Sequence, residues 1–413
     1  MTKGFKHIIV AALALMAVAT AAPAQDKPTA REHIGFQLSG TMGRIVPQHD
    51  YIASLLHSYS CNYQDFRFLW RTQPADGRLF DKNYHYPILQ AGLMHGDFSH
   101  IRLNRFAPDY DSKLGHAIVA YGGIQIDFLR RGNWSLGGDL QNGVAFFTKH
   151  YNYYNNRDNE VIGSVAALYF GASLQTRYRV APQWTVGLSG DFRHCSNGHI
   201  TRPNLGTNTI SGSVSVTYDL EPQKALSKAD TLTASATDNT GSVDGRKDPK
   251  FFVDLSAGVS TKSLLEEFMA DPSTRVHTYG VFTAMVAPMI RYHRMHASGA
   301  QFDFMYANYM DKVREIDIRN GHEGQYRYSP FIMGVALRHE LFYRHFSMNA
   351  SFGIYLRHRT GHYSATEESK LYQTMGLRYN FPFTDDRLFI GYNVKAHKLS
   401  KADCMQFMVG WRL

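Results

Sequence analysis

The stretch AALYFGASLQTRYRV, from Ala166 to Val180, alternates apolar and polar side chains. Its even positions carry Ala166, Leu168, Phe170, Ala172, Leu174, Tyr178 and Val180, and its odd positions include Ser173, Gln175, Arg177 and Arg179. Because successive side chains of a β-strand point to opposite faces, this pattern predicts a strand with one apolar and one polar face. Segments of about ten residues with this alternation are typical of strands that cross an outer membrane, with lipid on one side and a polar lumen on the other.

The same alternation recurs along the chain. It is present in 118–128, 210–220, 251–259, 348–356 and 405–413. The final segment, from Met405 to Leu413, also resembles the terminal strand of assembled outer-membrane barrels. Connections alternate between tight turns, such as Ala181-Pro182, and long polar loops, such as 197–207. In barrels of this kind the long loops lie outside the cell, so the end of the strand before residue 197 is expected at the outer surface.

We therefore predict an all-β chain that forms a transmembrane, antiparallel outer-membrane β-barrel. Counting gives about eight strands in each half, so the first expectation is a single barrel of about 12–16 strands. The alternative is an 8-stranded barrel beside a second β-rich barrel block, because periodicity does not reveal which strands pair. Residues 25–220 would form a first block that carries the candidate site, and 250–413 a second block. Between them, 221–249 is rich in Thr, Ser, Ala and Asp and predicts a flexible polar connector.

Residues 1–24 predict an export signal. Lys3 and Lys6 give a basic start, 8–18 an apolar core, and Ala22-Pro23-Ala24 a cleavage site. The expected location is therefore the outer membrane of a bacterium. Past this leader, no apolar run approaches the roughly 20 residues that a membrane-spanning helix requires.

Composition excludes several kinds of site. The three cysteines, Cys61, Cys195 and Cys404, are odd in number and widely spaced, so neither a disulfide framework nor a zinc site is predicted. The 20 histidines show no metal-ligand spacing, and no nucleotide or nucleic-acid motif occurs. We therefore expect no metal, no cofactor and no nucleic-acid partner. The sequence makes no prediction of oligomeric state.

The candidate site lies at the end of the strand predicted over 183–196. His194 and Ser196 share the parity of its apolar face, so both are expected to point out of the barrel, towards lipid. Positions i and i+2 of a strand are about 7 Å apart at the backbone, which lets an imidazole nitrogen reach a serine hydroxyl. His194 could then act as general base and Ser196 as nucleophile. The competing interpretation is that two polar residues simply end a strand in the headgroup region.

The run His194-Cys195-Ser196-Asn197, followed by Pro203-Asn204-Leu205-Gly206 and Asn208, resembles the active-site segment of the lipid A 3-O-deacylases, also called acyloxyacyl hydrolases. These are outer-membrane β-barrel esterases. The family pattern has histidine, any residue, serine and asparagine, then a Pro-Asn-x-Gly turn, and an acid twelve residues after the serine. Residues 250–413 lie outside the compact form of the family, although longer members with a second β-rich block fit this layout.

The resemblance implies a role for each matching residue. His194 would be the base and Ser196 the nucleophile, while Asn197, Gly198 and Asn204 would shape the oxyanion pocket and the substrate site. The position of the family's acid falls on Asn208.

An amide in place of that acid is a departure from the family. An amide oxygen can still orient a histidine ring, although it stabilises the imidazolium less, so we expect an intact but slower site unless Asp158 or Glu160 takes over. His199 is a second departure, because the compact family usually has a small residue there.

The resemblance implies a serine esterase that removes an ester-linked 3-hydroxyacyl chain from lipid A of lipopolysaccharide. Arg202 could attract lipid phosphates, as could Arg193, although Arg193 has lumen parity and either charge could simply be solvated. Two alternatives remain: a non-enzymatic barrel, either porin or structural, and an outer-membrane phospholipase that uses the same site. His358-Arg359-Thr360 repeats the spacing of histidine and hydroxyl without the following turn, and we interpret it as structural.

Overall fold

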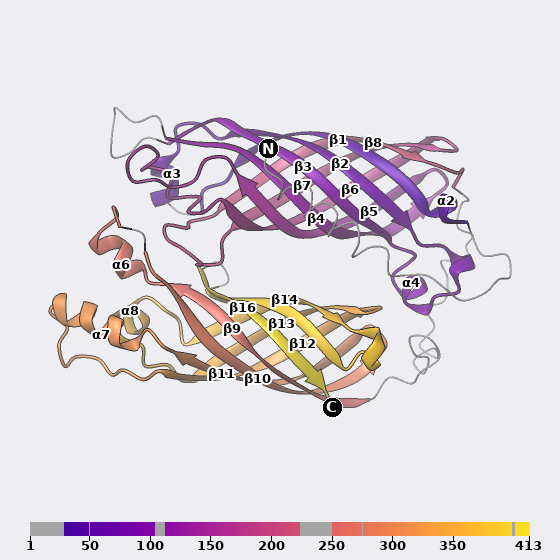
Figure 1. Cartoon of the computed structure of the whole chain (residues 1–413). Helices are drawn as coiled ribbons and strands as arrows, with labels where there is room; N and C mark the ends of the chain where they lie inside the picture. The colour runs from indigo at the N-terminus through magenta and orange to yellow at the C-terminus, as the bar shows by residue number, and fades with distance from the viewer. Residues whose placement is uncertain (1–28, 49, 104–111, 224–249, 275, 399–400) are drawn as a thin grey trace.

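The computed structural model describes residues 29–48, 50–103, 112–223, 250–274, 276–398 and 401–413. In this part of the chain the strands form two closed antiparallel barrels, which Figure 1 shows side by side. The first barrel consists of β1 (Ile34–Ile45), β2 (Ser60–Arg71), β3 (Ile88–Leu103), β4 (Ser112–Arg131), β5 (Trp134–Phe147), β6 (Ala166–Ala181), β7 (Trp184–Ser196) and β8 (Thr207–Asp219). It closes because β8 pairs with β1 along the whole strand.

The second barrel follows the same up-and-down order. It consists of β9 (Phe251–Ser263), β10 (Thr278–His293), β11 (His296–Ala307), β12 (Phe331–Tyr343), β13 (Phe346–Arg357), β14 (Leu371–Asn380), β15 (Leu388–His397) and β16 (Lys401–Arg412). It closes through the pairing of β16 with β9. The expectation of one barrel of 12–16 strands is therefore wrong, because each set of strands closes on itself, and the alternative of two barrels is confirmed.

Short helices lie before β1 and in the connections between strands. They are α2 (Ala30–His33), α3 (Asp50–Leu55), α4 (Leu79–Asn83), α6 (Leu265–Ala270), α7 (Met310–Arg319) and α8 (Gly361–Thr366). No helix among the described residues is both long and apolar enough to cross a membrane. The leader expected at 1–24, and all but the first residues of the connector expected at 221–249, lie outside the described residues.

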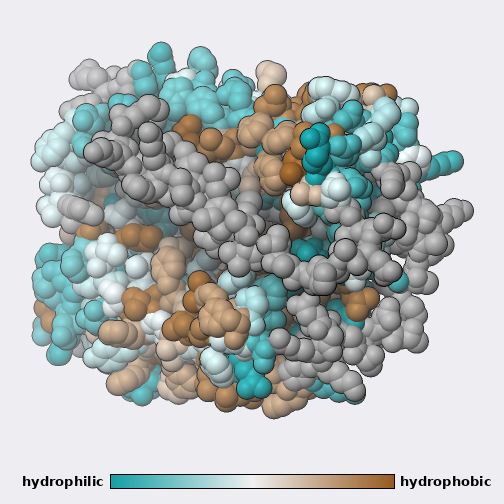
Figure 2. All heavy atoms as spheres, turned by 45° about the vertical axis from the view of Figure 1, so that its right-hand side comes forward, coloured by the Kyte–Doolittle hydropathy of each residue, from teal (hydrophilic) through white to brown (hydrophobic). Residues whose placement is uncertain are grey.

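The outer walls are apolar, as the alternation predicts. Exposed apolar side chains on them include Leu38, Leu174, Leu188 and Val214 of the first barrel and Phe282, Leu337, Phe352 and Phe407 of the second. Figure 2 shows patches of hydrophobic side chains on the walls of both barrels. An apolar outer wall around a polar interior is the arrangement of a barrel that lies in lipid.

The interiors are filled by paired charges. In the first barrel, Arg67 lies 2.7 Å from Asp65 and 2.8 Å from Asp139. In the second, Asp254 binds both Arg378 and Arg412 at 2.8 Å. Buried charges are costly unless they are paired, and these pairs explain how so many charged residues fit inside two narrow cylinders. The polar face of each strand is therefore a packed interior.

The helix α4 of the first barrel contacts the second barrel. This contact lies at the end of the barrels opposite the last residue of β7, and we call that end the turn end. Phe80 of α4 packs into a cluster with Phe252, Met285 and Phe342 of the second barrel. Its neighbour Asp81 is fully buried and pairs with Arg344 in the turn between β12 and β13. The first barrel thus contributes part of the apolar core that closes this end of the second.

The walls also meet midway along the strands. The Tyr392 hydroxyl of β15 donates a hydrogen bond of 2.6 Å to the side-chain oxygen of Asn142 on the outer face of β5. The Asn142 amide nitrogen donates to the Tyr169 carbonyl within the first barrel at 3.3 Å. The second barrel supplies the partner of the amide oxygen, which would be costly to leave unpaired in lipid. Asn142, Phe170, His194 and Asn208 are consecutive cross-strand partners, so the contact lies in the row that contains the candidate site.

Candidate active site

The end of β7 places His194 and Ser196 on the outer wall. Asp191, Arg193 and Cys195 are buried on the lumen side of this strand, whereas Phe192 is 39% exposed on the other. His194 and Ser196 share the parity of Phe192 and are half-buried. Both side chains therefore point out of the first barrel, at the end where the long loop 197–206 begins.

Asn208 orients the imidazole. His194 and Asn208 are direct partners in the ladder between β7 and β8, and His194 Nδ1 lies 2.7 Å from Asn208 Oδ1. Because the amide oxygen can only accept, Nδ1 carries the proton. This leaves Nε2 with a free lone pair, which is the tautomer that a general base requires.

The Ser196 hydroxyl accepts a hydrogen bond from the backbone N–H of Gly198 at 3.3 Å. Among the described contacts, His194 and Ser196 do not bond to each other. Both residues pack against Gly206 instead. A Cβ on this glycine would lie 3.2 Å from Ser196 Cβ and 3.3 Å from His194 Cε1. Catalytic hydrogen bonds are often long in the free enzyme and shorten when substrate binds, so the lack of a direct bond in the free protein does not exclude this pair.

Asn197 and Asn204 hold the loop together. The Asn197 N–H donates to Asn204 Oδ1 at 3.0 Å. The Asn197 side chain donates to Ser164 Oγ at 3.1 Å and to the Thr201 carbonyl at 3.3 Å. The Asn204 oxygen and the Asn197 amide nitrogen are thus engaged in holding the loops. The donor that faces the serine is the backbone N–H of Gly198.

The preceding long loop of the first barrel supports the last residues of the loop 197–206. The N–H groups of Leu205 and Gly206 donate to the carbonyls of Glu160 and Val161 at 3.1 and 2.9 Å. The Glu160 carboxylate accepts from the Tyr51 hydroxyl, and Asp158 is fully buried. The amide of Asn208, rather than either of these carboxylates, therefore holds His194.

Gly163 is a site residue that the sequence pattern did not reveal. A Cβ at Gly163 would overlap the Pro203 carbonyl, so only glycine lets the two loops approach. The signal was present in the sequence as a glycine within a polar loop, but nothing local indicates its partner 40 residues later.

The tip of the loop, residues 198–202, leaves the first barrel and lies against the second. The Ser263 hydroxyl of β9 donates to the His199 carbonyl at 2.9 Å, and the Thr278 hydroxyl of β10 donates to the Ile200 carbonyl at 2.7 Å. Burial lowers the pKa of His199 well below its usual value, and the Arg202 guanidinium lowers it further.

The two arginines considered as phosphate contacts are both engaged. The Arg202 Nε donates to the Ser263 carbonyl at 3.4 Å, so this side chain reaches the second barrel. Arg193 lies inside the first lumen, as its parity predicts, 3.3 Å from Asp191. Neither is therefore a preformed phosphate site.

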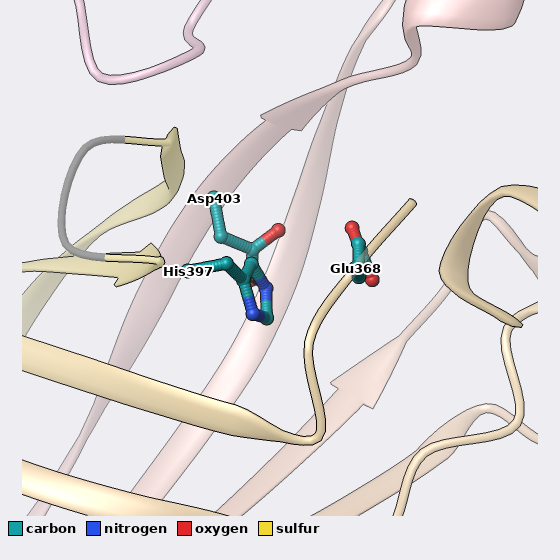
Figure 3. Close-up of side chains that lie close together, drawn as sticks. All are labelled: Glu368, His397 and Asp403. Carbon is teal, nitrogen blue, oxygen red and sulfur yellow. Dashed lines mark ion pairs between the residues drawn. The ribbon is translucent and has the colours of Figure 1, made fainter. Parts of the chain in front are cut away.

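A second cluster of titratable groups occupies the loop end of the second barrel. Figure 3 shows His397 and Asp403, from β15 and β16, with the Glu368 carboxylate facing them. Their ligand atoms lie within 4.8 Å of one another, which is close enough to consider a metal ion. However, Lys262 Nζ lies 2.7 Å from Asp403 and 3.3 Å from Glu368. The ammonium group of Lys262 already supplies a cation between the two carboxylates, so we interpret these residues as an ion-pair cluster.

His358 belongs to the same cluster. Its Nε2 lies 3.2 Å from Glu368 and 3.3 Å from the Thr360 hydroxyl. The repeated spacing of histidine and hydroxyl at this position therefore forms a local contact beside the Lys262, Glu368 and Asp403 cluster.

Two family models match the sequence. One, described as Lipid A 3-O-deacylase (PagL), matches residues 74–217, which include His194, Ser196 and Asn208. The other, described as Acyloxyacyl hydrolase, C-terminal domain, matches residues 251–413, the whole of the second barrel. Together the two matches take in most of the chain. No curated protein matches the sequence.

Solved structures of outer-membrane proteins resemble the fold at low sequence identity. Neisserial surface protein A is 13% identical, with a TM-score of 0.26, and the match covers 45% of this chain and 96% of that one. An outer membrane channel from Pseudomonas putida F1 is 8% identical, with a TM-score of 0.21 and coverage of 95% and 98%. OccK5 (OpdH) from Pseudomonas aeruginosa is 10% identical, with a TM-score of 0.21 and coverage of 92% and 98%.

Proposed function

Because the chain belongs to the lipid A 3-O-deacylase (acyloxyacyl hydrolase) family, we propose that it is a serine esterase of the bacterial outer membrane that removes an ester-linked 3-hydroxyacyl chain from lipid A. Ser196 would be the nucleophile, His194 the general base and Asn208 the group that orients it. The observation that carries this proposal is the bond of 2.7 Å between His194 Nδ1 and Asn208, on the outer wall and two residues from a serine.

The reaction follows from the groups present. Nε2 of His194 takes the proton of Ser196 as Oγ attacks the ester carbonyl carbon. The oxyanion that forms beside Oγ would accept a hydrogen bond from the Gly198 N–H, which lies 3.3 Å from Oγ in the free protein. Collapse of this intermediate breaks the bond to the sugar oxygen, which receives the proton from His194. A water molecule, deprotonated by His194, then attacks the acyl carbon; the bond to Ser196 Oγ breaks, Oγ receives the proton from His194, and the fatty acid leaves.

The outward direction of the site suits a substrate that stays in the membrane. Phe192 and Leu188 continue the wall of β7 below His194, and both are exposed. An acyl chain could lie along this wall while its ester reaches Ser196. The interiors of both barrels are packed with charged side chains, which argues against a porin function.

The proposal is tested with the purified protein in detergent micelles and purified lipopolysaccharide. Free 3-hydroxy fatty acid is measured by mass spectrometry for the wild type, Ser196→Ala and His194→Ala. Each variant is expected to lower the rate by about 10⁴-fold, because loss of nucleophile or base removes the covalent route. The matched control is His358→Gln, which alters the other histidine that precedes a hydroxyl, and it should release fatty acid at the wild-type rate.

Wild-type release by Ser196→Ala would contradict the proposal. A phospholipid added to the same micelles distinguishes the alternative substrate, because a phospholipase would release fatty acids without a 3-hydroxyl group. We expect the phospholipid to remain intact.

A further inference from the structure

The loop that faces the proposed nucleophile is held by both barrels. Its first and last residues bond to the first barrel, whereas the tip, 198–202, bonds to the second. Three consecutive carbonyls in the tip have partners: those of His199 and Ile200 accept from Ser263 and Thr278, and that of Thr201 accepts from Asn197. Two of these three donors belong to the second barrel.

The backbone of the tip adopts a conformation that requires such support. Gly198 has φ 60° and His199 has φ 63°, so two successive residues are left-handed. This region is unfavourable for a residue with a Cβ, and His199 persists there only where its surroundings hold it. Met405, on the outer face of β16, is buried beneath the tip, and its Cβ would lie 3.1 Å from a Cβ on Gly198.

This arrangement bears on the reaction because Gly198 carries the N–H that faces the Ser196 hydroxyl. The direction of that N–H is set by the peptide between Asn197 and Gly198 and by the left-handed turn that follows. Side chains of the second barrel that hold this turn therefore also hold the Gly198 N–H in its direction. The contacts of these groups described above are with the tip and not with Ser196.

We propose that Ser263, Thr278 and Met405 of the second barrel are positioning residues for the deacylation reaction, holding residues 198–202 so that the Gly198 N–H meets the oxyanion formed at Ser196. This inference rests on the proposed function of Ser196. It assigns a role in catalysis to the second barrel: the site is built on the first barrel and completed by the rim of the second.

The test compares the double variant Ser263→Ala/Thr278→Val with the control Ser351→Ala/Thr374→Val. Ser351 and Thr374 bond to each other inside the second barrel, so the control likewise removes two hydrogen-bonded hydroxyls from that barrel. Hydrolysis of lipopolysaccharide in micelles gives kcat and KM for each. We expect kcat of the test variant to fall about tenfold or more, the effect of two lost hydrogen bonds, with KM within about twofold of the wild type. The control should keep both values.

A second measurement separates positioning from general loss of structure. A fluorophosphonate reacts with an activated serine through an intermediate that uses the same N–H donor, so its rate of reaction with Ser196 should fall in parallel with kcat. Thr278→Ser and Ser263→Thr retain a hydroxyl, and each is expected to keep most of the activity. The single variants Ser263→Ala and Thr278→Val keep the test decisive if the double variant does not fold.

The outcomes are distinguishable. If Ser196→Ala abolishes activity but the test variant and its control behave alike, the inference is overturned and the proposed function stands. If KM rises while kcat is unchanged, the rim contributes to binding and the positioning role is also overturned. Full activity of Ser196→Ala would overturn the proposed function itself.

Discussion

The hydrogen bond between His194 and Asn208 determines what the imidazole can do. The amide oxygen fixes the proton on Nδ1, as a carboxylate would, but it carries no charge to stabilise the imidazolium that forms when Nε2 takes the serine proton. The register of β7 and β8 places the two residues directly opposite each other, so a carboxylate at position 208 would occupy the same place.

Asn208→Asp is therefore expected to raise kcat, by at least about tenfold, because a carboxylate stabilises the imidazolium in the transition state. Initial rates on lipopolysaccharide in micelles measure this. The control is Asn142→Asp, which adds the same charge to the outer face three strands away from position 208, where Asn142 accepts from Tyr392, and should leave kcat unchanged. An unchanged or lower kcat in Asn208→Asp would show that Asn208 does not orient the base.

Gly206 packs against both His194 and Ser196. It has φ 75°, and a Cβ would lie 3.1 Å from the Cys195 carbonyl as well as close to both side chains. Gly206→Ala should lower kcat at least about tenfold, since a displacement of about 1 Å at a catalytic group costs roughly a hundredfold. Gly132→Ala is the matched control, because Gly132 is also left-handed at φ 58° but has open space around it. Equal activity of the two variants would rule out close packing at Gly206.

At the scale of elements, alternation predicted which face of each strand meets lipid. Gln175 and Arg177 lie in the lumen and Leu174 on the wall, as their parity requires. The same logic placed His194, Ser196 and Asn208 on the outside. Periodicity could not predict that the tip of loop 197–206 bonds to Ser263 and Thr278, because that contact joins residues more than 60 positions apart and no local pattern encodes it.

The ion-pair cluster at the loop end of the second barrel predicts a dependence of stability on pH. Burial lowers the pKa of His358 to about 4, Lys262 and Lys395 act in the same direction, and Glu368 and Asp403 oppose them. An unfolded histidine titrates near pH 6.5, so the unfolded chain binds more protons between these values. Stability should therefore be full above pH 6.5 and decline as the pH falls towards 4.

His358→Gln removes this contribution. Between pH 7 and pH 4.5 the wild type should lose about 2 kcal/mol more unfolding free energy than the variant, as measured by urea titration in detergent. Other groups titrate in both proteins and cancel in the comparison. Parallel losses in the two proteins would show that His358 is protonated as easily in the folded state as in the unfolded one.

At the scale of the whole molecule, the sequence predicted the strands but not their pairing. Alternation looks the same in a strand that closes a small barrel as in one that continues a large one. The closure of the first barrel depends on β1 meeting β8, and that of the second on β9 meeting β16. Both pairings join strands far apart in the chain. The sequence pattern was therefore compatible with a single barrel and with two barrels, and the structure distinguished them.

The insertion of α4 predicts that the two barrels stabilise each other. Phe80 of the first barrel is buried in the core that closes the turn end of the second. Phe80→Ala should lower the stability of the second barrel by about 3–5 kcal/mol, the usual effect of removing a buried phenyl ring. Tryptophan fluorescence of Trp411, during urea unfolding of a variant in which the other tryptophans are replaced, reports on the second barrel. Leu79→Ala is the control, because Leu79 is exposed, and a similar loss in both variants would contradict the packing.

We propose that His194 activates Ser196 on the outer wall of the first barrel. The most direct measurement is peptide mass spectrometry of the purified protein after reaction with a fluorophosphonate. We expect covalent label on Ser196 in the wild type and no label on Ser196 in His194→Ala. A wild-type protein without label at Ser196, or one labelled equally well without the histidine, would contradict it.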